Sequence, residues 1–245
     1  ILLGQNVNAY QYENYRLSDL ILEIEKFSKL ERIRYTTSHP KDMTDDLIDV
    51  YKNSKKLMPL VHLPVQSGSD KILELMNRKH TISEYLRVFE NLKEINPKIQ
   101  FSSDFIIGYP GEEDSDFKLT LNLIKRIKFI NSFSFIFSPR PGTVAANLKL
   151  IDKNISIDRL EKIQYELYEN QIFMNKSLIN KNLNVLVENL TDDKTKLFGR
   201  SEYMTPVIFE GKKENIGQIM SVKITHNNRS TLFGEKSVNS NQKVA

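Results

Sequence analysis

Short apolar runs alternate with amphipathic segments along the first 140 residues. In each amphipathic segment, apolar side chains recur every three or four positions, as on the buried face of a helix. These predicted helices span residues 17–30, 44–54, 70–77, 81–95 and 115–128. The apolar runs that we predict to be strands span residues 1–5, 32–38, 60–66, 99–108 and 132–138. This alternation favours a parallel sheet covered by helices, either a barrel or an open doubly wound sheet.

The pattern changes after residue 139. An apolar stripe at helical spacing predicts one long helix over residues 157–179, with Ser156 as its N-cap. Beyond residue 180, five short alternating runs are broken by Gly, Asn and Asp, which is typical of a small antiparallel barrel. We therefore expect a β/α unit over residues 1–180 and a small β-barrel over residues 181–245.

Candidate site residues follow the predicted strands of the β/α unit, where ligands meet parallel α/β sheets. Each strand end is polar, rich in Gly or Pro, or both. The five ends span residues 5–6, 36–40, 66–69, 108–112 and 138–143. Turn and capping roles explain any one of these ends. Five at one edge of a sheet predict a wide polar mouth.

Three charged residues belong to this predicted mouth. Asp104 lies inside a strand, where it is either a satisfied structural group or a ligand contact. Glu112 is expected to begin a helix, where the helix dipole favours a carboxylate. Arg140 lies between two prolines and suits either a bound carboxylate or phosphate, or a surface ion pair. His62, inside an apolar strand, is expected to be a packed and hydrogen-bonded histidine.

Composition narrows the chemistry that these 245 residues can perform. The chain has no Cys, which excludes disulfides and thiolate metal sites within it, and its four His argue against a His-rich metal site. No apolar run is long enough to span a bilayer, and we find no phosphate-binding loop, dinucleotide fingerprint or nucleophile elbow. The net charge is +4, with a small basic surplus over residues 181–245 that permits contact with nucleic acid.

Five segments, in order along the chain, carry a resemblance to a known family. They are LLGQNVNAY (2–10), RIRYTTSHPKDM (32–43), HLPVQSGSDKILELMNR (62–78), SSDFIIGYPGEEDSDF (102–117) and SFSFIFSPRPGTVAA (132–146). The chain resembles the radical S-adenosylmethionine methylthiotransferases, and within them the MiaB-type tRNA enzymes. Its C-terminal strands look like a TRAM module, the small RNA-binding barrel of that family. Val144 departs from the family pattern, which usually has Pro at that position.

The resemblance implies a partial radical-SAM barrel followed by a TRAM barrel. It also implies replacement of the C2–H of an N6-prenylated adenosine, beside the tRNA anticodon, by a methylthio group. Members carry a CxxxCxxC segment and three further cysteines upstream, which hold two 4Fe-4S clusters. We therefore expect this chain to be about the C-terminal half of a longer, cytoplasmic, monomeric enzyme that uses an electron donor protein and has no membrane contact.

The residues that would contact S-adenosylmethionine and the substrate are taken from the strand ends of this chain. They are Gln5, Gln66, Ser67, Ser103, Asp104, Gly108 and Arg140. Gly108 would let the backbone approach the nucleoside. In the TRAM-like part the residues expected to contact RNA phosphates are Lys194, Lys196, Arg200, Lys212, Lys213 and Arg229. Phe198 and Tyr203 lie near them for stacking on bases.

Two other functions remain open at this point. As it stands, the chain could be a non-catalytic RNA-binding module, which predicts salt-sensitive binding of tRNA without iron. It could also be a cysteine-free α/β enzyme that binds a phosphate ligand at the same mouth, although the lack of a phosphate loop argues against this.

Overall fold

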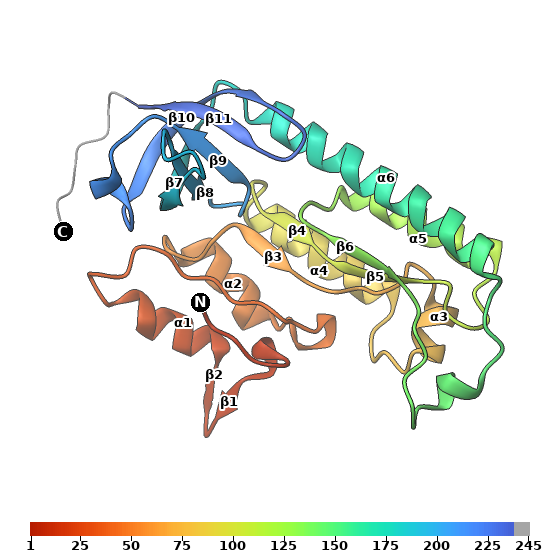
Figure 1. Ribbon diagram of the computed structural model, residues 1–245. Helices are drawn as coiled ribbons and strands as arrows, with labels where there is room; N and C mark the ends of the chain where they lie inside the picture. Colours follow the sequence, from red (N-terminus) through yellow and green to blue (C-terminus); the bar gives the residue numbers. More distant parts are fainter. Residues whose placement is uncertain (238–245) are drawn as a thin grey trace.

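The computed structural model describes residues 1–237 of the chain. Its first part holds the helices α1 (Leu17–Glu25), α2 (Asp45–Asn53), α3 (Asp70–Leu75), α4 (Ile82–Ile95) and α5 (Asp114–Ile127). It also holds the strands β1 (Gln11–Tyr12), β2 (Tyr15–Arg16), β3 (Leu60–His62), β4 (Gln100–Ser102), β5 (Asp104–Ile107) and β6 (Phe133–Ile136). Figure 1 shows β3 to β6 crossing the middle of the molecule beside α4 and α5.

Apart from the short antiparallel pair of β1 and β2, the strands of this part pair in parallel, as the alternation of strands and helices predicts. β3 pairs with β4 and β5 with β6, and single parallel bridges at Leu2–Tyr35, Ile33–Leu57 and Gln66–Phe105 continue the order. The strands expected over residues 1–5 and 32–38 are therefore reduced to bridges. No described helix, within residues 1–237, is long and apolar enough to cross a membrane.

The first expected strand also differs from its prediction in burial. Ile1 and Leu3 are 75% and 76% exposed, and only the partly buried Leu2 joins the sheet, where its N–H donates to the carbonyl of Arg34. A buried strand needs neighbours on both faces, and here only one residue in this run has them. The first helix is likewise shorter than expected, because it ends at Glu25 and leaves Phe27 exposed.

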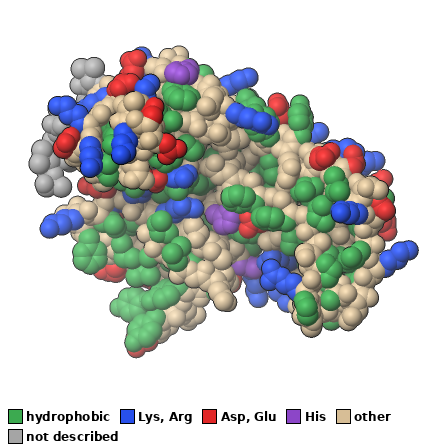
Figure 2. All heavy atoms as spheres, in the orientation of Figure 1, with side chains coloured by type: hydrophobic (Ala, Val, Ile, Leu, Met, Phe, Trp, Pro, Cys, Tyr) green, Lys and Arg blue, Asp and Glu red, His purple; other side chains and the backbone are tan. Residues whose placement is uncertain are grey.

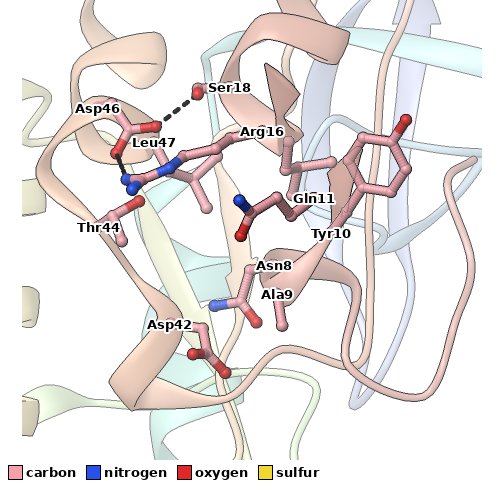
Figure 3. A pocket seen from close by; sticks show the side chains of 11 residues that line it. Asn8, Ala9, Tyr10, Gln11, Arg16, Ser18, Asp42, Thr44, Asp46 and Leu47 are labelled. Atoms are coloured by element: carbon pink, nitrogen blue, oxygen red, sulfur yellow. Dashed lines mark hydrogen bonds and ion pairs between the residues drawn. The ribbon is translucent and has the colours of Figure 1, made fainter. Parts of the chain in front are cut away.

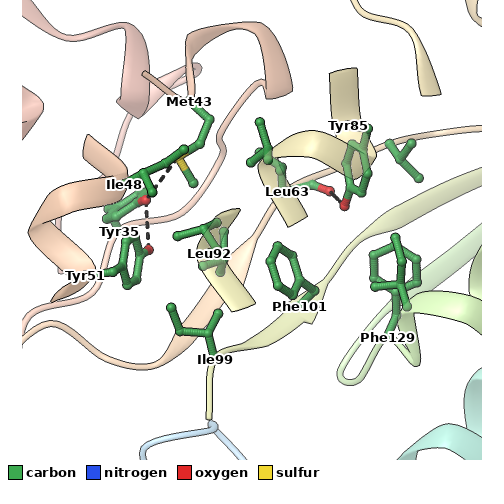
Figure 4. Close-up of a cluster of buried hydrophobic side chains, with 14 of the residues drawn as sticks. Tyr35, Met43, Ile48, Tyr51, Leu63, Tyr85, Leu92, Ile99, Phe101 and Phe129 are labelled. Atoms are coloured by element: carbon green, nitrogen blue, oxygen red, sulfur yellow. Dashed lines mark hydrogen bonds between the residues drawn. The ribbon is translucent and has the colours of Figure 1, made fainter. Parts of the chain in front are cut away.

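Buried tyrosines tie the helices to the strands in the main hydrophobic core. The Tyr51 hydroxyl donates to that of Tyr35 at 2.8 Å, and the Tyr85 hydroxyl donates to the carbonyl of Leu63 at 2.8 Å (Figure 4). Each of these tyrosines therefore buries its ring without leaving its hydroxyl unpaired.

A long helix, α6 (Lys153–Ser177), leads from the β/α unit to the small barrel (Figure 1). It begins four residues before the expected start, because the Asp152 carboxylate accepts hydrogen bonds from the N–H groups of Asn154 and Ile155. Ser156 is therefore not the N-cap. It is buried in the first turn, where its hydroxyl donates to the carbonyl of Asp152.

The second part is a closed five-stranded barrel. Its strands are β7 (Asn182–Leu190), β8 (Leu197–Arg200), β9 (Pro206–Phe209), β10 (Ile219–Asn227) and β11 (Leu232–Lys236). They close in the order β10-β11-β9-β8-β7. The expected barrel is confirmed, but it is not wholly antiparallel, since β9 and β11 pair in parallel. β10 pairs antiparallel with β7 on one side and with β11 on the other, and β11 therefore runs in the same direction as β9.

The two parts are in direct contact. The Arg32 guanidinium donates to the carbonyls of Asn184 at 2.8 Å and Arg200 at 3.2 Å, and the Asn131 amide donates to the carbonyl of Tyr203 at 2.7 Å. The expected boundary at residue 180 lies in the short link between α6 and β7, while residues 238–245 of the expected second part lie outside the described residues.

Candidate functional site

The first two strand ends are joined by an asparagine. Asn8 donates its side-chain amide to the carbonyl of His39 at 2.9 Å and accepts the His39 N–H at 2.8 Å. Asn6 reaches the same loop, because its amide donates to the Asp42 carboxylate at 2.6 Å. Gln5, expected to contact the cofactor, is exposed beside them. These bonds hold two loops that are thirty residues apart in a single polar edge.

A pocket of about 200 Å³ lies next to this edge (Figure 3). Asp46 closes one side, where it accepts a hydrogen bond from the Ser18 hydroxyl at 2.5 Å and pairs with Arg16 at 3.4 Å. Burial acts to raise the pKa of Asp46, but its hydrogen bonds and the nearby Arg16 outweigh burial and lower it. Asp46 therefore stays charged at neutral pH.

The third strand end is turned toward the protein itself. Gln66 is buried with a φ of +71°, and its N–H donates to the Asp104 carbonyl at 3.0 Å. The Ser67 hydroxyl lies 3.3 Å from that of Thr120 and accepts the N–H of Ser69 at 3.2 Å. Ser67 therefore fixes this loop against α5, and a direct contact of its hydroxyl with a cofactor stays a prediction.

Ser103 has a similar internal role. It is fully buried between β4 and β5, and its hydroxyl accepts the N–H of Val65 at 2.9 Å. Its own N–H donates to the Ser132 hydroxyl, also at 2.9 Å. The serine thus joins three neighbouring strand segments at the point where the fourth expected strand is interrupted, and any contact with a cofactor stays a prediction.

Asp104 is the acidic residue within the strands β1 to β6 of the β/α unit. Its side chain is 31% exposed, and its carboxylate lies 3.6 Å from Nε2 of His62. Nδ1 of His62 is 2.6 Å from the Ser102 hydroxyl, so that His62 is the packed and bonded histidine that its strand predicts. Asp104 alternates with Phe105, which faces the core, and it therefore points to the face of the strands opposite the packed helices.

Two cationic residues accompany Asp104, Arg78 as an electrostatic neighbour and Arg140 on the segment that follows β6. Burial lowers the pKa of Arg78, and the charge of Asp104 acts in the opposite direction, so that the two groups are electrostatic neighbours. Arg140 follows β6 on an exposed segment, and its guanidinium has no ion pair or hydrogen bond within the described residues 1–237. It is therefore available to an anionic group.

The fourth strand end is fixed by a buried ion pair. The Glu112 carboxylate accepts the N–H of Gly108 at 3.0 Å and pairs with Arg159 of α6 at 2.9 Å. Glu112 therefore does not begin a helix as expected, since α5 begins at Asp114 after Glu113. Burial raises the pKa of Glu112 even though the Gly108 and Arg159 contacts oppose this shift.

Gly108 is required here by the protein's own packing. Its φ is +72°, and a Cβ at this position would lie 2.6 Å from the Ser156 hydroxyl oxygen. On this side the close neighbour is Ser156 of α6, and an approach of the nucleoside to the Gly108 backbone stays a prediction. Arg159 and Asn8 are the residues of this edge that sequence reasoning missed. Asn8 follows the first strand, which is a usable signal, but no local pattern marks Arg159.

The cations expected to contact RNA differ in how free they are. Lys196 pairs with Glu210 at 3.4 Å, and Arg200 pairs with Glu188 at 3.3 Å. Lys194, Lys212, Lys213 and Arg229 are exposed on the connections between the barrel strands. Figure 2 shows basic and acidic side chains interspersed over the barrel. Tyr203 is buried in the barrel core at 6% exposure, and it is therefore not available to stack on a base.

Comparison with known proteins decides the family. The profile described as the Radical SAM superfamily matches residues 1–124, which is half of the chain. This chain belongs to the radical SAM superfamily. The profile of the TRAM domain matches residues 176–236, which include the closed barrel.

Two relatives share the same printed name, "tRNA-2-methylthio-N(6)-dimethylallyladenosine synthase". The protein of Pelagibacter ubique (strain HTCC1062) is 68% identical over 100% of this chain and 56% of its own length. That of Orientia tsutsugamushi (strain Boryong) is 45% identical over 98% of this chain and 55% of its own length. This radical SAM chain thus spans about half the length of the curated relatives that it matches.

A solved radical SAM enzyme, coproporphyrinogen III oxidase from Escherichia coli, is also similar in structure. It is 14% identical to this chain, with a TM-score of 0.48 over 83% of this chain and 50% of its own. Membership of the superfamily implies S-adenosylmethionine and iron–sulfur chemistry. This chain has no cysteine, and residues 1–237 hold no group of three His, Cys, Asp or Glu that could bind a metal ion. Its residues therefore do not fit as ligands of an iron–sulfur cluster.

Proposed function

We propose that this chain is the substrate-binding and RNA-binding part of a tRNA methylthiotransferase. The whole enzyme would replace the C2–H of an N6-prenylated adenosine next to the anticodon with a methylthio group, in the cytoplasm, as a monomer supplied by an electron donor protein. The observation that carries this proposal is 68% identity to the Pelagibacter ubique relative over the full length of this chain.

The face of β5 and β6 to which Asp104 points has groups that suit the methionine end of S-adenosylmethionine. The free Arg140 guanidinium matches a carboxylate in a paired hydrogen-bonding geometry. The partly exposed Asp104 carboxylate can accept hydrogen bonds from an ammonium or from ribose hydroxyls. Both groups follow or lie within neighbouring strands, β5 and β6, that pair in parallel.

The other strand-end residues hold in place the loops and strands that carry Asp104 and Arg140. Ser67 and Ser103 hold loops and strands through their hydroxyls, and Gln66 contributes a buried backbone bridge. Gly108 and Gln5 complete the proposed edge, Gly108 through the backbone held by Glu112. We propose direct ligand contacts for Asp104 and Arg140, and a positioning role for the buried residues.

A chimera tests this function in a cell. This chain replaces the matching 56% of the Pelagibacter ubique protein, and the chimera is expressed in a bacterial strain that lacks its own tRNA methylthiotransferase. We expect mass spectrometry of tRNA nucleosides to detect the 2-methylthio form of the prenylated adenosine. Chimeras with Asp104→Asn or Arg140→Met should accumulate the unmodified prenylated nucleoside, while Lys153→Met, an exposed change at the start of α6, should not. Unmodified nucleoside with the parent chimera, although it is folded and abundant, refutes the proposal.

The second candidate is a non-catalytic RNA-binding module. The intact barrel, together with the absence of cysteine from this chain, favours it for the chain on its own. It predicts that the isolated chain binds tRNA in a salt-dependent manner without iron. This outcome, combined with an inactive chimera, would make RNA binding the function that survives.

A further inference from the structure

The outer surface of the barrel carries a row of flat and apolar side chains across neighbouring strands. Along β8, β9 and β11 the residues Leu197, Val207 and Leu232 face the barrel core and are fully buried. The residues that follow each of them are Phe198, Ile208 and Phe233. Because side chains alternate between the two faces of a strand, these three point outward.

The register places these outward residues side by side. Phe198 is opposite Ile208 in the β8–β9 pair, Ile208 is beside Phe233 in the β9–β11 pair, and Phe233 is opposite His226 in the β10–β11 pair. Four strands therefore contribute one side chain each to a continuous row. We call His226, Phe233, Ile208 and Phe198 the aromatic row.

Two neighbouring rings of this row are stacked on each other. His226 and Phe233 lie with their ring centroids 4.7 Å apart and an angle of 3° between their planes. The Arg200 guanidinium lies over Phe198, with 5.8 Å between its central carbon and the ring centroid. Phe198, Ile208 and Phe233 are partly exposed, and His226 is exposed, so that the row remains accessible in the described chain.

Arginines lie at both ends of the row. At the Phe198 end, Arg200 keeps its ion pair with Glu188 at 3.3 Å and is joined by Arg34 of the β/α unit, whose pKa is lowered by burial and then by the like charge of Arg200. The Arg34 guanidinium has no acidic partner or hydrogen bond within residues 1–237. At the other end, Arg229 lies in the loop between β10 and β11, with its guanidinium 4.3 Å from the ring centroid of Tyr168. Flat rings between positive ends suit bases joined by phosphates.

We propose that the aromatic row is a stacking platform for the unpaired bases of a single-stranded RNA segment, with Arg34 and Arg200 holding a phosphate at its Phe198 end. Stacking on aromatic faces tolerates any base, because every base presents a π-face. Bases inside a duplex cannot reach such a platform. The claim that the natural ligand is tRNA rests on the proposed function. The claim that unpaired bases stack on the aromatic row does not depend on it.

The experiment uses this chain and a short single-stranded RNA that carries 2-aminopurine and no prenylated base. Stacking on a ring should quench the 2-aminopurine fluorescence when the unaltered chain binds. Phe198→Leu and Phe233→Leu keep an apolar side chain and remove the ring, and each should weaken binding of this RNA roughly fivefold or more. Phe233→Trp should retain the affinity and the quenching.

Two controls separate stacking from charge and from misfolding. Phe173→Leu removes a 59% exposed ring of α6 outside the row, and it should leave the affinity unchanged. A duplex of the same total charge should bind the leucine variants and the unaltered chain equally well. Arg34→Met should weaken both RNAs and reduce the salt dependence of binding, because a phosphate contact carries no information on base pairing.

Either of two results overturns the platform. One is that the unaltered chain binds the single-stranded RNA but does not quench its 2-aminopurine fluorescence; this result can be obtained without any variant. The other is a leucine variant, shown by its unfolding midpoint to be folded, that binds the single strand as well as the unaltered chain does. Because this RNA has no prenylated base, failure here leaves the chimera experiment intact, and an inactive chimera leaves the platform intact.

Discussion

Replacing Arg159 by methionine should destabilise the fold, because it leaves the buried carboxylate of Glu112 without its charged partner. The side chains of Arg159 and Glu112 are 6% and 1% exposed, and their charged atoms are 2.9 Å apart. Removal of one partner of a buried pair costs about 3–5 kcal/mol, because the other charge is left desolvated. Glu112 can avoid part of this cost by binding a proton. We therefore expect a loss of about 3 kcal/mol in the free energy of unfolding at pH 7.

The double variant Glu112→Gln with Arg159→Met shows whether the lost stability comes from the unpaired Glu112 charge or from lost packing of the Arg159 side chain. It removes the stranded carboxylate and keeps an amide oxygen that can accept the N–H of Gly108. We expect it to recover at least half of the stability that Arg159→Met loses. Lys162→Met is the matched control on the same helix, since its pair with Asp158 is exposed at both ends and should contribute nothing measurable.

The loss should also depend on pH with a definite sign. Burial raises the pKa of Glu112 in the folded chain, and removal of Arg159 takes away an opposing influence. A carboxyl with a raised folded pKa contributes stability that is present below its unfolded pKa and is lost as the pH rises through the folded value. The deficit of Arg159→Met should therefore be smaller at pH 5 than at pH 7.

Urea unfolding followed by circular dichroism measures these differences at both pH values. The reasoning is refuted if Arg159→Met loses less than about 1 kcal/mol at pH 7, well below the range for a broken buried pair. It is equally refuted if the double variant is no more stable than the single one, because the stranded charge would then not be the cause.

Three further changes can be measured by the same unfolding assay. Gly108→Ala should destabilise the fold by about 2–3 kcal/mol, because its φ of +72° is strained for alanine and the new Cβ would clash with the Ser156 hydroxyl. Gly142→Ala has a φ of +83° but open space around it, and should cost only about 1 kcal/mol. Equal costs for the two variants would contradict the clash with Ser156. Burial is the largest cause that lowers the pKa of His80 to about 4, so stability should fall as the pH drops from 6.5 toward 4, and His80→Leu should flatten that slope. Tyr85→Phe leaves a buried carbonyl without its donor and should cost about 1–2 kcal/mol; a neutral change would mean that another donor replaces the hydroxyl.

The helices could be predicted from sequence because their signals are local. In α4 the apolar spacing is accompanied by a capping box, in which Thr81 accepts the N–H of Glu84 and the Glu84 carboxylate accepts the N–H of Thr81. The strand ends were harder to predict, because a parallel strand exists only where its neighbour runs alongside. Leu2 and Tyr35 lie in runs that look like strands, yet they share only a single bridge.

The site was predictable to the extent that its residues lie on strands. Asp104 was chosen because strand ends carry the ligands of parallel sheets; the structure leaves its side chain partly exposed, and its contact with a ligand stays a prediction. The Glu112–Arg159 pair could not be found, because its partners are 47 positions apart and the local pattern assigned Glu112 to a helix start. The parallel β9–β11 pair was missed for the same physical reason, since pairing direction follows from the path of the chain around the barrel and not from alternation within a strand.

Helix α6 links the edge of the proposed cofactor face to the barrel. Near its start, Ser156 packs against Gly108, and further along the helix Tyr168 lies under Arg229. A helix rises 1.5 Å per residue, so these two contacts are about 18 Å apart along its axis. Arg32 prevents the barrel from turning freely, because its guanidinium is bonded to carbonyls of two barrel strands. A substrate that reaches both the strand ends and the aromatic row must therefore extend over several nucleotides, which a folded RNA does and a free nucleoside does not.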